Sequence, residues 1–398
     1  MRKQIRRLLN SLLVLLLLSG CWDRWELNEL SLIVGMAIDK DDTNYILTMQ
    51  AMNPSEIASQ ETGRGYAQAM NVQEKSETIH ESLRKMVQKS PRRSFISQLK
   101  VLIISEEVAQ EGLEHVLDFF FRDHEVRSDF YIVIARDNKA SEILQVITPL
   151  ETLPSQSIYD SIRFSLRSYS GTKAITMDEL YQEMMAEGIE PTVMGITVEG
   201  DLEVGKTKEN AETNQAAAKL RINGIALFQD NKLIDWFTED YSKGLDYLTE
   251  NISDSVTSIK CPSGGELALE SRKTKRELDV HLTNDTPSAT YSFTIESSIS
   301  EVDCQGLDLA SSSDFAEIQS KAENEFRDSL LQTVQATQAL KSDAFGIGQA
   351  IYRKYPTYWE THREDWPAIF AEMDIDVQVE INLTDSGSII NSFSKRGR

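Results

Sequence analysis

The sequence predicts a mixed α/β and α+β protein of two to three domains. In the first half, strand-like and helix-like hydrophobic patterns alternate, which favours strands covered by helices. In the second half, strand-like segments surround one long amphipathic helix. The chain has 398 residues, and domains average roughly 150 residues. We therefore expect an N-terminal α/β domain over residues 21–205 and a C-terminal α+β domain over residues 206–398, in which an antiparallel sheet is covered by the long helix.

The first half begins with a predicted hairpin. Two apolar segments at 31–38 and 45–52 flank the acidic residues 39–44, which are typical of a turn. This turn lacks the glycine and the glutamate that an EF-hand calcium loop requires, so we do not interpret it as a calcium site. Apolar residues at helical spacing then alternate with short apolar runs. We expect helices at 79–87, 113–120 and 140–146, and strands at 99–104 and 131–135.

The second half begins after the polar, alanine-rich residues 206–217, which are the best candidate for an interdomain boundary. A second hairpin is expected at 220–237, with its turn at Asp230 and Asn231. Farther on, the alternation of apolar and polar residues indicates strands, and a stripe at three- and four-residue spacing indicates a helix. We expect strands at 277–282, 291–299 and 374–383, and the long helix over 315–334.

The composition excludes several classes of protein. The chain has 63 Asp+Glu against 41 Lys+Arg and a formal charge of -22, so we expect no nucleic-acid partner, because polyanions are bound mainly through Lys and Arg. A hydrophobic fraction of 40% argues against disorder. Only one strongly apolar stretch occurs, which excludes a protein that crosses the membrane many times. We interpret the acidity as a solvated surface, which anionic lipid headgroups would repel.

Residues 1–20 are predicted to be an export signal. Four cations precede a leucine-rich run at 8–18, and small residues follow it, which is the three-part pattern of a secretory signal. The apolar run of about 11 residues would rise about 17 Å as a helix, well short of the roughly 30 Å hydrocarbon layer. We therefore expect this segment to direct the chain to export and then to be cleaved off.

The end of the signal resembles a bacterial lipobox, formed by Leu18, Ser19, Gly20 and Cys21. Small residues let a signal peptidase approach the backbone, and the thiol is nucleophilic enough to take up a diacylglyceryl group. We expect Cys21 to carry S-diacylglycerol and an N-acyl group. Two or three acyl chains would hold the protein durably on a membrane, whereas a single chain binds marginally.

No catalytic or metal site is visible in the sequence, and we expect neither a cofactor nor enzymatic activity. His115 and His124 lack a carboxylate at the spacing that a metallopeptidase helix requires, so we interpret them as ordinary surface or core histidines. Phosphate-binding glycine loops and the Gly-x-Ser-x-Gly motif of hydrolases are also absent. Apart from Cys21, the cysteines are Cys261 and Cys304. They could form a disulfide after export, or both could stay unpaired.

Short motifs along most of the chain resemble one known family. They are CWD at 21–23, EL at 26–27, IDK at 38–40, KVLII at 100–104, EGL at 111–113, FRDHEVR at 121–127, GIALF at 224–228, SDAFGIG at 342–348 and YPTYW at 355–359. Together they resemble the Ger(x)C spore germination proteins, the C subunits of nutrient germinant receptors. Trp25 departs from the pattern, because the family more often has a charged residue there.

The resemblance implies a noncatalytic lipoprotein on the outer face of the spore inner membrane, where it is required for nutrient-triggered germination. Its partners would be a polytopic B subunit and an A subunit with membrane and soluble parts, and Cys21 would attach it to membrane lipid. A mixed α/β fold, in which the second half divides near residue 265, is also implied. Trp22, Phe345, Trp359 and Trp366 are either contact residues for these partners or residues of the core.

An alternative is a lipid-anchored solute-binding protein that captures the germinant itself. Such proteins usually have two similar α/β lobes around a hinge, and a binding pocket lies between them. The two halves of this sequence differ in pattern, which favours the receptor subunit.

Overall fold

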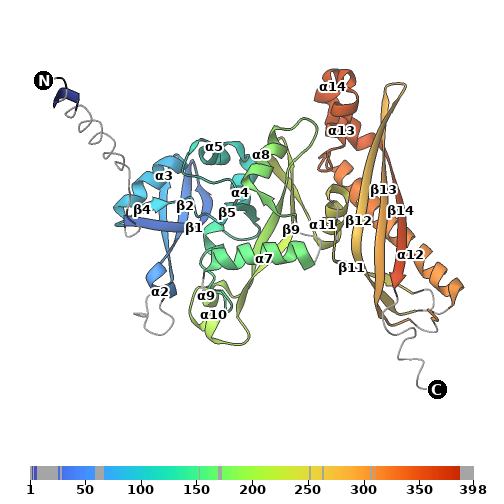
Figure 1. Ribbon diagram of the computed structural model, residues 1–398, viewed down its shortest axis with the longest axis horizontal. Coiled ribbons are helices and arrows are strands. Elements are labelled where there is room, and N and C mark those ends of the chain that lie inside the picture. Colours follow the sequence, from blue (N-terminus) through green and yellow to red (C-terminus); the bar gives the residue numbers. More distant parts are fainter. Residues whose placement is uncertain are drawn as a thin grey trace.

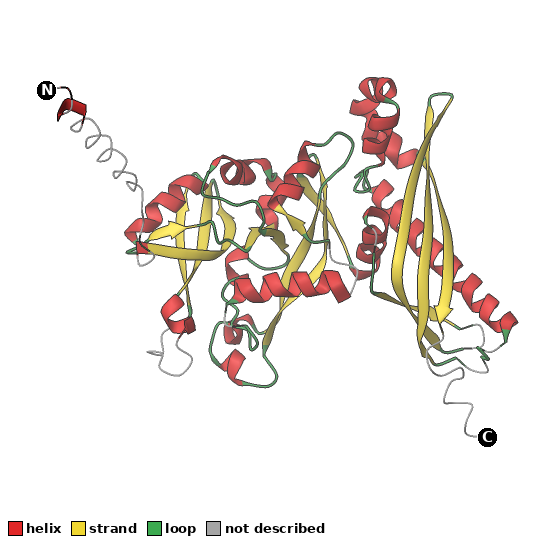
Figure 2. Ribbon diagram, viewed as in Figure 1, coloured by secondary structure: helices red, strands yellow, loops and turns green. Residues whose placement is uncertain are grey.

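The computed structural model describes residues 2, 4–6, 26, 29–58, 67–151, 153–168, 173–250, 252–261, 264–304, 307–309 and 311–385. Two β-sheets with their helices lie side by side along the longest axis (Figure 1). Helices and strands are mixed in both parts, and the long helix lies along the second sheet, as shown in Figure 2. The predicted mixed α/β and α+β class is confirmed.

The first sheet has ten strands within the described residues, in the order β10-β9-β8-β6-β5-β1-β2-β3, with β4 beside β1 and β7 beside β6. The strands are β1 (Leu30–Asp41), β2 (Asn44–Met52), β3 (Ala69–Ser76), β4 (Arg93–Phe95), β5 (Val101–Ser105), β6 (Tyr131–Ala135), β7 (Ile175–Thr176), β8 (Thr192–Gly200), β9 (Ala218–Gln229) and β10 (Lys232–Phe237). The predicted strands at 99–104 and 131–135 are therefore central, and both predicted hairpins are present as β1–β2 and β9–β10.

Helices cover both faces of this sheet, because the side chains of its central strands alternate between two cores. On β5, Leu102 and Ile104 join one core, whereas Val101 and Ile103 join the other. Burial on both faces explains why β5 and β6 have continuous apolar sequences. The helices of this part are α2 (Pro54–Ala58), α3 (Ile79–Lys85), α4 (Glu106–Glu111), α5 (Glu114–Arg122), α6 (Ala140–Ile143), α7 (Pro154–Ser168), α8 (Met177–Met185), α9 (Leu202–Gly205) and α10 (Glu209–Glu212).

The second sheet has the order β11-β12-β13-β14. Its strands are β11 (Ser255–Lys260), β12 (Glu266–Thr283), β13 (Thr286–Val302) and β14 (Asp374–Asp385). The first three pair antiparallel, but β14 pairs parallel to β13, so the expectation of an antiparallel sheet is wrong for this edge. Between β13 and β14 the chain runs through helices back to the end of the sheet where β13 begins. A crossover of this kind makes the two strands parallel.

The long helix α12 (Ser312–Ala339) covers this sheet, as predicted (Figure 2). The residues that it buries include Ile318, Ala322, Leu330 and Val334, which continue the stripe read from the sequence. At its start, the Ser311 hydroxyl accepts a hydrogen bond from the Asp314 N–H and so caps the helix. The other helices of this part are α11 (Glu239–Thr249), α13 (Ile347–Lys354), α14 (Pro356–His362) and α15 (Trp366–Glu372).

The sheets do not change at the predicted boundary between residues 205 and 206. That boundary falls between β8 and β9, which are paired strands of the first sheet. The polar residues 206–217 form a short connection that includes α10. Strand β9 also joins the two parts, because Ala226 and Phe228 belong to a first-sheet core, whereas Ile225 and Leu227 belong to the core of the second sheet. The two sheets therefore separate after β10, and the polar composition of 206–217 reflects a surface connection.

Asp39 was expected in the first turn but lies in β1, and the turn is shorter, because Asp41 pairs directly with Asn44. The Asp39 side chain is buried, and its two carboxylate oxygens accept hydrogen bonds from the Ala140 N–H at 2.7 Å and the Ser141 N–H at 2.9 Å. These are the first two N–H groups of α6, which have no partner within the helix. Asp39 therefore connects strand β1 to the start of α6.

We expect Asp39→Ala to lower the free energy of unfolding by about 2–4 kcal/mol, because two buried N–H groups lose a charged acceptor. Asp39→Asn, which keeps one acceptor oxygen, should have a smaller effect. Urea unfolding measures both. Asp41→Ala is the matched control, since Asp41 lies two residues along on β1 with an exposed side chain. Equal stability of Asp39→Ala and Asp41→Ala would contradict the role of Asp39.

Candidate functional site

The predicted lipidation site lies outside the described residues, as do the lipobox residues Leu18, Ser19 and Gly20 and the predicted contact residue Trp22. Cys21 precedes the first residue of β1, Leu30, by nine positions. Within the described part of the chain, no helix is long and apolar enough to cross a membrane.

Cys261 and Cys304 are joined by a disulfide, with their Cα atoms 5.6 Å apart. Cys261 follows β11, and Cys304 follows β13, so the bond links the two strands that flank β12 at the same end of the sheet. Both residues are buried. The sequence left a bridge and two unpaired thiols open, and the hairpin geometry of β11 to β13 brings the two sulfur atoms together.

A buried polar site lies where the two sheets meet, around Asp343. This residue follows α12 and is 3% exposed. Its carboxylate accepts hydrogen bonds from the N–H of Ile347 at 3.1 Å, the N–H of Gly348 at 2.6 Å and the indole N–H of Trp366 at 3.0 Å. The Asp343 carbonyl accepts a further bond, from the Glu190 N–H of the first part. Asp343 therefore fixes the start of α13 and also contacts the segment between α8 and β8.

That segment approaches the second part closely through its backbone. The Gly188 carbonyl accepts a hydrogen bond from the Gln349 N–H, and the Glu187 carboxylate accepts one from the Trp359 indole N–H. A Cβ on Gly188 would lie 2.4 Å from the carbonyl carbon of Gly348, and its φ of +73° also favours glycine. We call the residues 187–190 and 342–349 the interdomain junction.

The predicted contact residues of the second half lie in the interdomain junction or bond to it. Phe345, Trp359 and Trp366 are only 5%, 3% and 4% exposed. The two tryptophan rings are 5.3 Å apart, and each indole N–H donates to a carboxylate. Buried indoles usually need such a partner. These three residues therefore belong to the core that joins the two parts, and they are not surface contacts for another protein.

Two carboxyl groups of the interdomain junction have perturbed acidity. Burial raises the pKa of Glu190 to about 7, and the nearby carboxylates of Asp230 and Asp343 add to the shift. Burial also raises the pKa of Asp343 to about 6, although its hydrogen bonds from Gly348, Trp366 and Ile347 favour the charged form. Negative charge accumulates at this contact as the pH rises.

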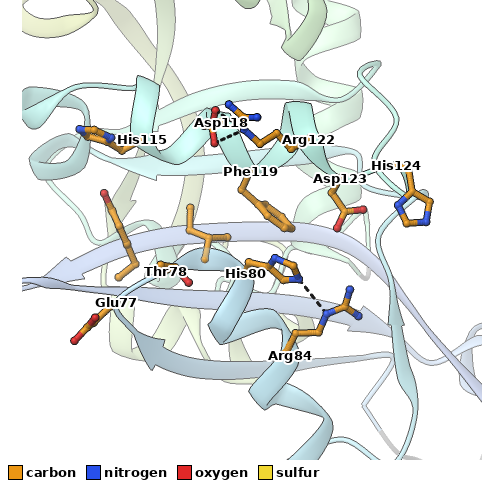
Figure 3. Close-up of a pocket in the computed structure, with 12 residues that line it drawn as sticks. Glu77, Thr78, His80, Arg84, His115, Asp118, Phe119, Arg122, Asp123 and His124 are labelled. Carbon is orange, nitrogen blue, oxygen red and sulfur yellow. Dashed lines mark hydrogen bonds and ion pairs between the residues drawn. The ribbon is translucent and has the colours of Figure 1, made fainter.

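A second candidate site is an open groove of about 800 Å³ on the first part, between α3 and α5. Figure 3 shows His80 and Arg84 of α3 facing Phe119 and Arg122 of α5. The Phe119 ring lies 5.6 Å from the imidazole of His80. The His80 ring nitrogen accepts a hydrogen bond from the Arg84 side chain, and Arg122 binds both oxygens of Asp118.

The groove is also lined by His115 and His124, at its opposite ends in Figure 3; from the sequence we interpret both as ordinary surface or core histidines. His80 and Arg84 are four residues apart, and so are Asp118 and Arg122. This spacing in the sequence indicates that each helix has a polar face, because residues four apart are neighbours on a helix. Among the described residues, no group of three or more His, Cys, Asp and Glu side chains is arranged to hold a metal ion. The groove combines an aromatic surface with charges of both signs, which suits the binding of a polar partner or solute.

The fold defines a two-part α+β protein joined through a buried interdomain junction, and comparisons with known proteins identify the family. The model of the spore germination protein N-terminal domain matches residues 23–198, and the spore germination B3/GerAC-like C-terminal model matches residues 223–387. The chain therefore belongs to the Ger(x)C family of spore germination proteins, and the resemblance in the sequence is confirmed.

Similarity to individual proteins supports this family assignment. Spore germination protein KC of Bacillus subtilis (strain 168) is 29% identical, over 96% of this chain and 97% of its own. Spore germination protein B3 of the same organism is 24% identical, over 94% of this chain and 96% of its own. The crystal structure of the GerBC protein is 18% identical with a TM-score of 0.54, covering 88% of this chain and 96% of that one. This last likeness shows the shared fold.

We expect the double substitution Cys261→Ser with Cys304→Ser to lower the free energy of unfolding by about 3–4 kcal/mol, because the disulfide closes a loop with a sequence separation of 43 residues. Urea unfolding measures the loss, and reduced wild-type protein should behave like the variant. Two free thiols in the exported, unreduced protein would contradict this bond.

The raised pKa of Glu190 predicts that stability falls with rising pH. A carboxyl group with a raised pKa binds its proton more tightly in the folded state. Its contribution is complete below the unfolded pKa, near 4.5, and is lost as the pH passes the folded value of about 7. In Glu190→Gln this contribution is absent, so the melting temperature should fall less between pH 6 and pH 7.5 than in the wild type.

Glu209→Gln is the matched control for this measurement, because Glu209 is exposed on α10. It should follow the wild-type curve. An unchanged slope in Glu190→Gln would show that this carboxyl group does not titrate in that range.

Proposed function

We propose that the protein is a noncatalytic lipoprotein subunit of a spore nutrient germinant receptor, that it is required for nutrient-triggered germination, and that it acts by assembly with membrane A and B subunits. The main support is that both spore germination family models match, one over residues 23–198 and the other over residues 223–387. Relatives with spore germination names match nearly the full length. The family is not a known enzyme family, which agrees with a role in binding and assembly.

The proposed attachment is a lipid on Cys21, on the outer face of the spore inner membrane. It is supported by the export signal and by Leu18, Ser19 and Gly20 directly before the cysteine. Acyl chains on Cys21 would place the folded body close to the membrane, because only residues 22–29 separate it from β1. The A and B subunits would then be reached at the membrane surface.

The alternative of a lipid-anchored solute-binding protein has less support. Such proteins have two similar lobes, whereas the described residues of this chain form a ten-stranded sheet followed by a four-stranded one. Their binding pocket lies between the lobes, but here Asp343 of the interdomain junction is buried, and so are Trp359 and Trp366, which donate hydrogen bonds to the junction. The groove between α3 and α5 lies within the first part instead.

We expect Cys21→Ala to abolish lipidation, to move the protein out of the spore membrane fraction, and to abolish germination in response to nutrients. Immunoblots of spore fractions and the loss of optical density after nutrient addition measure these effects. Ser11→Ala is the matched control, because it changes the same export signal but leaves the lipobox unchanged. Normal nutrient germination by spores whose protein is unlipidated would overturn the proposal.

A further inference from the structure

One stretch of this acidic chain is strongly basic. Residues 82–105 contain six Lys and Arg and no Asp or Glu, although acidic residues outnumber basic ones in the whole sequence. Five of the six lie between residues 84 and 93, which we call the basic segment. They are Arg84, Lys85, Lys89, Arg92 and Arg93. Such a local excess of positive charge against the overall balance points to an anionic partner.

The basic segment lies beside the place where the chain enters the folded body. Its last residue, Arg93, begins β4, which pairs in parallel with the start of β1, so that Arg93 is opposite Leu30. Paired strands are about 5 Å apart. Leu30 follows Cys21 by nine residues, a length of chain that reaches at most about 30 Å. A lipid on Cys21 would therefore keep the basic segment within about this distance of the membrane surface.

The basic segment is also accessible. It comprises the last turn of α3, a short 3₁₀ helix (Met86–Gln88) and the turn before β4. Met86 is fully buried and fixes the segment to the core, whereas Val87 is 62% exposed. Arg84, Lys89 and Arg92 are exposed as well. An apolar side chain between exposed cations suits the interface between headgroups and acyl chains.

Carboxylates of the same surface engage some of these cations. Lys85 pairs with Glu81, Lys89 with Glu74, and Arg93 with Glu125. The cations of the first two pairs, Lys85 and Lys89, are 43% and 52% exposed, and ion pairs of exposed side chains contribute little. Arg92 is exposed and takes no part in these three pairs. The segment therefore keeps cations that can bind another anion.

We propose that the basic segment binds anionic lipid headgroups and orients the protein on the membrane. This inference rests on the proposed anchor at Cys21, because the anchor supplies the high local concentration that makes a few cations sufficient. Electrostatic forces act over only about 8 Å at physiological salt, so the cations must approach the headgroups directly. The acidic remainder of the body is repelled, which leaves the basic segment as the preferred contact.

The proposed contact gives the body a defined orientation. In Figure 1, α3 and β4 lie at one end of the longest axis, and the second sheet with α12 lies at the other end. A protein that rests on the basic segment therefore directs the second sheet away from the bilayer. The groove between α3 and α5 adjoins the same end, because Arg84 belongs both to the groove and to the basic segment.

The test uses the full-length processed protein as isolated from spore membranes, in vesicles of phosphatidylcholine alone or with 30% phosphatidylglycerol. Val87→Cys carries an environment-sensitive fluorophore, and a quencher is placed on the lipid headgroups. We expect quenching at position 87 to be at least fivefold stronger in the vesicles with phosphatidylglycerol, because one cation near an anionic surface strengthens binding about fivefold. A label at Ser320, on α12 of the second part, should not be quenched in either vesicle.

Charge-reversal variants supply the matched comparison. Lys85→Glu with Arg92→Glu should reduce quenching at position 87 to the level seen with phosphatidylcholine alone. Arg327→Glu with Arg353→Glu makes the same change of charge on exposed residues of α12 and α13 and should leave the quenching unchanged.

Flotation of the vesicles separates the two proposals. Protein that floats with both vesicles, but shows no greater quenching at position 87 with phosphatidylglycerol, keeps the anchor and overturns the headgroup contact. Protein that floats only with phosphatidylglycerol supports the contact and overturns the lipid anchor. Protein that floats with neither overturns both.

Discussion

The joining of the two sheets depends on the hydrogen bonds of one buried residue, Asp343. It accepts hydrogen bonds from two backbone N–H groups and one indole, and its own carbonyl receives the Glu190 N–H from the first part. An unpaired charge in such a place would be strongly unfavourable, so these donors must stay in position while the residue is ionised. The start of α13, the ring of Trp366 and the segment before β8 are thereby held in one arrangement.

This constraint explains other features of the interdomain junction. The backbone of Gly188 must come within hydrogen-bonding distance of Gln349, and a side chain at that position would collide with Gly348. Strand β9 contributes residues to the cores on both sides, so the two parts share apolar as well as polar contacts. A spore germination protein built in this way presents a continuous body, in which relative motion of the sheets would expose buried carboxylates and tryptophans.

The proposed functional geometry follows from where the ends of this body lie. The chain enters at the edge formed by β1 and β4, and the basic segment is part of that edge. The second sheet lies at the far end of the longest axis (Figure 1). If lipid on Cys21 and the basic segment both face the membrane, the second sheet and α12 are available to soluble parts of other receptor subunits. In this proposal, the fold would turn attachment through a short segment into a defined orientation on the membrane.

Local patterns in the sequence were enough to predict the central strands β5 and β6, both hairpins and the apolar stripe of α12. Their signals depend on residues close together in the chain, such as the continuous apolar run of a strand buried on both faces. The expected boundary at 205/206 falls between two paired strands of the first sheet, because a polar connection between paired strands resembles a linker in the sequence. The groove was missed because His80 and Phe119 meet only when α3 packs beside α5.

The sequence by itself predicted the export signal and the lipobox ending at Cys21, and it determined the acidic composition and the motifs of the family, because each is carried by contiguous residues or short motifs. Only the tertiary structure decided that Cys261 meets Cys304, that β14 runs parallel to β13, and that Trp359 and Trp366 are buried. These features join segments that are distant in the chain. Their contacts depend on how strands and helices pack together, and local hydrophobic periodicity carries no information about that packing.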